Sequence, residues 1–157
     1  MTAPLATPSD QLALEVQTAR ELLALLEREQ AELTAARVEA LPDLTDQKNL
    51  LVARMATLAR TRYVALGAAA HSADEAGMRA WLDQGGNEAA RGQWDELLRL
   101  ATAARECNRT NGVLIGRHMA RNQAALGVLQ GAGGGGNLYG PDGQSTLRSS
   151  GHRLVAG

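Results

Sequence analysis

Residues 12–33 read LALEVQTARELLALLEREQAEL, and apolar side chains recur in this stretch at alternating steps of four and three residues. The positions in this series are Leu12, Val16, Ala19, Leu23, Leu26, Gln30, Leu33 and, just beyond the stretch, Arg37; the polar Gln30 and Arg37 weaken its far end. Steps of four and three place side chains on one face of an α-helix. The spacing therefore predicts a long amphipathic helix that begins at Ser9 or Asp10, after two prolines, and runs to about residue 40.

A second helix is predicted downstream of the segment LPDLTDQ at 41–47, where Pro42 is expected to stop the first helix and Asp43 or Thr45 to cap the next. It runs from 44 to about 70. Its apolar face is thinner and contains more alanine, and consists of Leu44, Leu51, Met55, Leu58, Arg62, Ala65 and Ala69. A short loop between two such helices favours an antiparallel hairpin.

Two further helices complete the predicted all-α fold. Ser72 and Glu75 have the spacing of a capping box, so a short helix is expected from there through Trp81 until the segment QGGN at 84–87 ends it. Asn87 is expected to cap a long helix from about 88 to 130. The sequence thus predicts a helical domain at 1–130, coiled-coil-like, followed by a flexible glycine-rich tail at 131–157.

The last helix carries polar residues where packed ones are expected. One seven-residue row is Trp94, Ala101, Asn108, Ile115, Asn122 and Leu129, and its companion is Leu97, Ala104, Asn111, His118 and Ala125. Buried asparagine is costly unless its polar atoms are paired. Two interpretations stay open: a partly exposed helix with asparagine at its edge, or a helix that stays incompletely packed until a partner covers Leu114, Ile115, Met119, Leu126 and Leu129.

Composition narrows the class of function. The 157 residues have a net charge of −1 and a single cysteine, Cys107, which suits a reducing compartment. Neither a signal peptide nor an apolar span is expected, so the protein is predicted to be cytoplasmic, with no membrane insertion. The row Arg105, Arg109, Arg117 and Arg121 lacks interleaved aromatic residues, so nucleic-acid binding is not expected. A basic helix face that meets the acidic first helix explains these arginines better.

Catalysis is not expected either. The three histidines, at 71, 118 and 152, are far apart and form no metal-ligand spacing. The run GAGGGG at 131–136 is followed by no Lys-Ser/Thr pair, so it is not a phosphate-binding loop. The sequence therefore predicts an interaction protein, with no catalytic residue, no metal, no cofactor and no small-molecule substrate.

Two segments carry a family resemblance. NRTNGVLIGRHMARNQAALGVLQG at 108–131, followed by LYGPDGQST at 138–146, resembles the FlgN family of bacterial flagellar export chaperones. The matching residues are Asn108, Asn111, Gly112, Leu114, Ile115, Asn122, Ala125, Leu126 and Leu129, then Tyr139, Gly140, Asp142 and Gly143. The segment LTDQKNLL at 44–51 looks like the start of that family's second helix, and the glycine insert at 133–136 departs from the family pattern.

The resemblance implies a chaperone that holds the hook–filament junction proteins FlgK and FlgL in the cytoplasm and delivers them to the type III export gate. A groove between long helices would receive an amphipathic client segment. The residues expected to bind the client are Asn111, Leu114, Ile115, Met119, Asn122, Leu126 and Leu129. Those expected to dock the tail on gate or client are Leu138, Tyr139, Gly140, Asp142 and Gly143.

Alternative interpretations stay open. A constitutive coiled-coil scaffold would form stable homo-oligomers, in which the asparagine row is satisfied across a symmetric interface. A chaperone of another secretion system would have the same helices and other clients. The tail segment NLYGPDGQST could also form an ordinary turn that folds back on the helical body and partly buries Tyr139.

Overall fold

The computed structural model describes residues 2–132, and nearly all of them lie in four α-helices. These are α1 (Leu12–Thr34), α2 (Leu41–Ala68), α3 (Glu75–Gly85) and α4 (Glu88–Ala132), and no strand occurs among the described residues. The all-α prediction is therefore confirmed. The chain divides into two units, residues 1–114 and residues 115–157, with the boundary inside α4. The predicted division between a helical domain and a tail at residue 130 stays a prediction.

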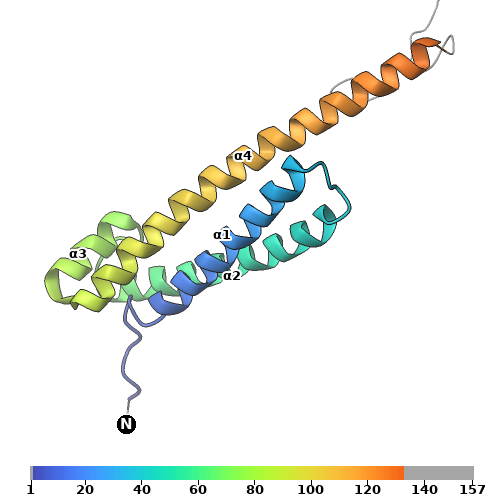
Figure 1. The fold of residues 1–157 in the computed structure, drawn as a ribbon. Coiled ribbons are helices and arrows are strands. Elements are labelled where there is room, and N and C mark those ends of the chain that lie inside the picture. The colour runs from blue at the N-terminus through green and yellow to red at the C-terminus, as the bar shows by residue number, and fades with distance from the viewer. Residues whose placement is uncertain (1, 133–157) are drawn as a thin grey trace, which may run out of the picture. The chain divides into compact units, whose positions relative to one another are not determined.

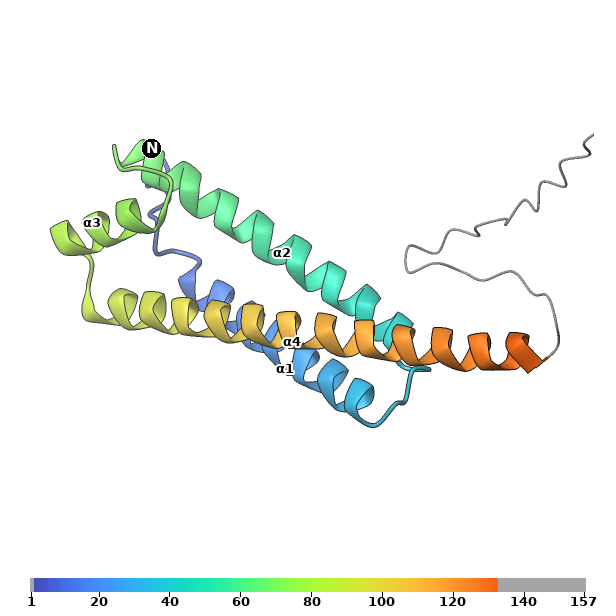
Figure 2. The same cartoon turned by 90° about the horizontal axis from the view of Figure 1, so that it is seen from above.

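Helices α1 and α2 form the antiparallel hairpin that the sequence predicts (Figures 1 and 2). Two ion pairs define its direction: Glu15, early in α1, pairs with Arg62, late in α2, and Glu29 pairs with Lys48. The predicted apolar faces meet in this hairpin. The buried members of the two faces are Leu12, Val16, Ala19, Leu26, Leu33, Leu44, Leu58, Arg62 and Ala65. Arg37 and Ala69 are exposed.

The core of residues 1–114 lies where the start of α1 meets α3 and the first half of α4. Its buried members are Leu12, Val16, Ala19, Leu66, Met78, Leu82, Ala90, Trp94, Leu97 and Leu100. Apolar side chains from all four helices thus leave water together, which is the main favourable contribution to folding. Trp94 supplies the largest of these side chains, and it sits on the row predicted to be packed.

The end of α1 and the start of α2 differ from the prediction. Helix α1 ends at Thr34 rather than near 40, because Ala36 has a left-handed φ of 55° and the chain turns there. The N–H of Arg37 donates to the carbonyl of Glu32, and that of Ala36 to the carbonyl of Leu33, which is a Schellman cap. Pro42 lies in the first turn of α2 and does not stop a helix, because its missing N–H has no helical partner there.

The predicted capping box at Ser72 and Glu75 is also wrong in detail. Asp74 is the N-cap of α3, and its Oδ1 accepts a hydrogen bond of 2.7 Å from the N–H of Gly77. The hydroxyl of Ser72 donates to that same carboxylate at 2.7 Å, so it supports the cap without being the cap. The backbone of Ser72 leaves no room for a Cβ at position 77. Asn87 does cap α4, through a bond of 2.7 Å from the N–H of Ala90, as predicted.

Candidate functional site

The second half of α4 presents a row of large apolar side chains to solvent. Ile115, Met119, Leu126 and Leu129 are 39%, 56%, 53% and 70% exposed, and Asn122 between them is also exposed. Steps of four, three, four and three residues separate these five positions, so they share one face of the helix. We call this face the α4 stripe. Single exposed apolar residues are ordinary, whereas a row of them along one helix face is typical of interaction surfaces.

Asn111 does not belong to this exposed row. It is buried, with 1% of its surface accessible, and its Nδ2 donates to the carbonyl of Leu26 and to Glu29 Oε1, both at 2.9 Å. Its Oδ1 is buried and accepts no hydrogen bond from the described residues. Asn111 therefore fastens α4 to α1, and among the predicted client-binding residues it is the buried one.

The remaining predicted residues divide into three groups. Leu114 is half-buried, and His118 on the neighbouring row is half-buried as well. Asn108, predicted on a packed row, is exposed. The five predicted tail residues, Leu138, Tyr139, Gly140, Asp142 and Gly143, lie outside the described residues.

Glu29 turns the contact at Asn111 into a polar layer that joins three helices. Its carboxylate is buried and accepts hydrogen bonds from Asn111 of α4 and from Lys48 Nζ of α2, the latter at 3.2 Å and 3.4 Å. A buried carboxylate is stable only when its oxygens are paired. Sequence reasoning missed this residue, although its distance of four residues from both Leu25 and Leu33 places it on the buried face of α1.

A second buried charge lies toward the other end of α1. Arg62 Nε donates to Glu15 at 3.1 Å and 3.3 Å, and its guanidinium lies 4.8 Å from the ring centre of Trp94 and 4.9 Å from that of Tyr63. Burial raises the pKa of Glu15, and the hydrogen bond from Arg62 opposes that shift. The arginine thus contacts α1 and α4 at once. The sequence pattern placed Arg62 on the packed face of α2, but it did not predict the ion pair with Glu15.

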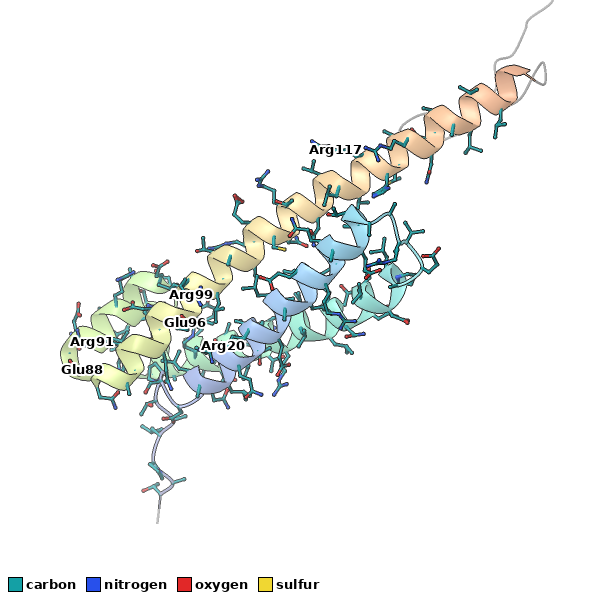
Figure 3. All side chains as sticks on the ribbon, in the orientation of Figure 1. Arg20, Glu88, Arg91, Glu96, Arg99 and Arg117 are labelled. Carbon is teal, nitrogen blue, oxygen red and sulfur yellow. The ribbon has the colours of Figure 1, made fainter. Side chains whose placement is uncertain are left out.

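The exposed charges tie α4 to α1 more loosely. Arg20 of α1 and Arg99 of α4 both contact Glu96, at 3.4 Å and 2.7 Å (Figure 3). Arg99, and after it Arg20, holds the pKa of Glu96 at about 2. The predicted contact of the arginine row with the acidic first helix is wrong for Arg109, which pairs with Glu106 of its own helix at 3.0 Å. Its geometry is the ordinary i, i+3 pair of an exposed helix face.

Three further properties bear on the kind of site. In residues 2–132 no three side chains of the His, Cys, Asp or Glu type gather in a way that could hold a metal ion. The helices that the structure describes include none with the length and hydropathy to cross a membrane. Burial raises the pKa of the Cys107 thiol, which lies 3.5 Å from Gln30 Oε1, and a raised pKa disfavours the reactive thiolate.

Fold and surface together define an all-α protein whose last helix carries an uncovered apolar stripe. The model of the FlgN protein family matches residues 1–146, and the chain belongs to that family. It is similar to the flagella synthesis protein FlgN of Yersinia enterocolitica, with 29% identity over 136 residues that cover 85% of this chain and 86% of the relative. A second relative of that name, from Yersinia enterocolitica serotype O:8, is 29% identical over 133 residues, which cover 83% of this chain and 84% of the relative. No solved structure matches the chain.

Proposed function

We propose that this protein acts in flagellum synthesis as a non-enzymatic export chaperone. In this proposal it binds the C-terminal amphipathic segments of the hook–filament junction proteins FlgK and FlgL in the cytoplasm. Binding prevents these clients from assembling too early, and the chaperone then delivers them to the export gate. Membership of the FlgN family and the names of its two relatives support the flagellar role.

The observation that carries the proposal is the α4 stripe. An amphipathic client helix presents apolar side chains at i, i+3, i+4 and i+7, and the stripe offers the complementary spacing. Complete burial of a fully exposed large apolar side chain contributes about 1.5–3 kcal/mol, and each of the four stripe side chains, which are 39–70% exposed, can contribute part of that amount. Association itself has an entropic cost that such a row can exceed.

The test compares Ile115→Asp and Leu126→Asp with Val128→Asp. All three native residues are exposed and apolar on the same helix, but Val128 is 75% exposed and lies off the stripe. We expect each stripe variant to weaken binding of FlgK and FlgL C-terminal segments by about tenfold or more, as for a central interface residue. Titration calorimetry measures the affinity, and thermal unfolding should be unchanged because the substituted side chains are exposed. Normal affinity in both stripe variants would exclude the stripe as the client site.

One observation favours a second candidate, a homo-oligomeric scaffold. Asn122 lies in the middle of the stripe, and a single asparagine in an apolar seam can set the register of a coiled coil. A stable oligomer of the wild-type protein that Leu126→Asp dissociates would support the scaffold. A pull-down with this protein from a lysate of the source cell would identify its clients. The result distinguishes a flagellar chaperone from a chaperone of another secretion system.

A further inference from the structure

An open groove of about 410 Å³ lies between α1, α2 and the first half of α4, within residues 19–108. We call it the three-helix groove. Its apolar lining residues are Ala19, Leu22, Leu26, Val52, Met55, Ala101 and Ala104, and its polar ones are Lys48, Asn49, Arg105 and Asn108. None of these residues belongs to the α4 stripe. The groove is therefore a separate surface, and the function proposed above does not use it.

The shape of the groove suits a helix of about two turns. On each of the three helices the first and last lining residues are seven positions apart, at 19 and 26, 48 and 55, and 101 and 108. Seven rises of an α-helix extend about 10 Å, or two turns. Three of the apolar lining residues are alanines, whose small side chains let another helix approach closely. The volume lies within the range of about 300–1,000 Å³ that is usual for binding sites.

Backbone hydrogen bonding favours a helix over an extended segment. Every lining residue belongs to α1, α2 or α4, whose peptide groups are bonded along their own helices. A buried extended segment would therefore find no backbone partners for its N–H and C=O groups, and each unpaired group is costly. A helical occupant satisfies these groups internally.

The charges around the groove indicate which side chains a bound helix would carry beside its apolar face. Lys48 of α2 and Arg105 of α4 line the groove, and no acidic residue is among its described lining residues. Lys48 pairs with Glu29, whereas Arg105 is exposed and has no carboxylate of the described chain within ion-pair distance. Arg105 also lies less than two turns before Asn111, which bonds Glu29, so both cations belong to the same end of the groove. The amides of Asn49 and Asn108 add further donors.

From this complementarity we propose that the three-helix groove is a second docking site, which binds an amphipathic partner helix with acidic side chains beside its apolar face. The apolar face packs against Leu22, Val52 and Met55. The acidic side chains pair with Arg105 and share Lys48 with Glu29. This assignment is independent of the client site on the α4 stripe.

The probe is a capped synthetic helix of about 15 residues, with leucine at i, i+4 and i+7, glutamate on both flanks and alanine elsewhere. The control peptide carries lysine in place of every glutamate. Fluorescence anisotropy with the full-length protein measures both affinities. We expect the glutamate peptide to bind, and the lysine peptide to bind more weakly because its charges repel Arg105.

Matched variants locate the binding site. Val52→Asp should weaken binding of the glutamate peptide by about tenfold, whereas Leu50→Asp, at an exposed apolar residue of the same helix outside the groove, should not. Arg105→Glu should weaken it by about three- to fivefold and improve binding of the lysine peptide. Arg117→Glu, at an exposed arginine of α4 outside the groove, should change neither affinity (Figure 3). Leu126→Asp should also leave the peptide affinity unchanged, and this separates the groove from the client site.

Three outcomes would overturn the proposal. The first is no binding of the glutamate peptide at millimolar concentration, and the second is equal affinity for the two peptides. The third is a wild-type dimer in sedimentation experiments that Val52→Asp dissociates, because that result assigns the groove to a second copy of the chain.

Discussion

Asn111 is buried between α4 and α1 and makes two hydrogen bonds, to the carbonyl of Leu26 and to Glu29. Asn111→Ala removes both bonds and leaves a small void beside a buried carboxylate. We expect the free energy of unfolding to fall by about 1–3 kcal/mol, the usual result when a buried hydrogen-bonding partner is lost. Urea unfolding followed by circular dichroism measures this change.

Asn108 and Asn122 supply the controls, because both are asparagines of the same helix and both are exposed. Alanine at either position should change the free energy of unfolding by less than about 0.5 kcal/mol. Equal effects at all three positions would mean that the buried amide contributes nothing specific.

Ala36 and Ala70 follow the ends of α1 and α2 with left-handed φ angles of 55° and 61°. At both sites the N–H of the alanine and that of the residue after it bond back into the helix, which makes each site a Schellman cap with alanine where glycine is usual. Left-handed backbone costs a residue with a Cβ about 1–2 kcal/mol, and glycine avoids most of that cost, so Ala36→Gly and Ala70→Gly should each add about 0.5–1 kcal/mol to the free energy of unfolding.

Ala35→Gly is the matched control for this pair, because Ala35 has an ordinary φ of −83°. Glycine there relieves no strain and increases the freedom of the unfolded chain, so the variant should lose stability. A loss at Ala36 as large as the loss at Ala35 would refute the strain argument.

At the scale of helices, the pair of Glu15 and Arg62 joins α1 to α2, and the contact of Arg62 with Trp94 extends the link to α4. Glu15→Ala leaves a buried guanidinium without its partner, and removal of one member of such a pair costs about 3–5 kcal/mol. The double variant Glu15→Leu with Arg62→Met removes both charges and fills the space. Its stability should lie close to that of the wild type, because an apolar pair has no charges to desolvate.

Thermal and urea unfolding of the two variants measure the difference. A double variant that is as unstable as Glu15→Ala would show that the contacts of the guanidinium with Trp94 and Tyr63, rather than its ion pair, dominate at this site. Calorimetry of the wild type at several pH values would then separate the contribution of the ion pair, which changes when Glu15 is protonated, from that of the ring contacts.

The faces of the helices were predictable because periodicity alone determines them. Leu12, Val16 and Leu26 follow the 4-3 spacing and are buried. The end of α1 was not predictable, because the left-handed turn at Ala36 is carried by a residue with no preference for it. The role of Pro42 was predicted wrongly for a related reason. A proline indicates the end of a helix or its first turn, and the sequence alone does not show which of the two applies.

The candidate site was predictable to a lesser extent. One of the two interpretations of the last helix left Ile115 and Leu126 incompletely packed until a partner covers them, and both are exposed. The two neighbouring rows of the last helix carried Asn108 and Asn122 on one and Asn111 on the other, all at positions expected to be packed, whereas only Asn111 of the three is buried among the described residues. Burial of one asparagine depends on Glu29, which is distant in sequence and therefore absent from any local pattern.

At the scale of the whole molecule, Tyr139 lies outside the described residues, and its role stays a prediction. Leu138 and Tyr139 follow a glycine-rich run, and ordering each glycine carries a large entropic cost. Tyr139→Ala should therefore leave the melting temperature nearly unchanged and impair delivery of clients to the export gate. A secretion assay for FlgK and FlgL measures delivery. A drop of several degrees in the melting temperature with normal delivery would instead make Tyr139 a core residue.

The exposed half of α4 also has a consequence for how long the protein survives. Most of the stability of a helix in a protein comes from packing, which this exposed segment has little of, and Gly116 and Gly127 weaken the segment further. Amide hydrogens beyond residue 115 should therefore exchange with deuterium much faster than those near the buried Trp94. Proteases cleave chains that open in this way. A molecule without a partner on the α4 stripe would therefore be degraded faster than one whose stripe is covered. The supply of partners would then set the abundance of the protein without any change in its synthesis.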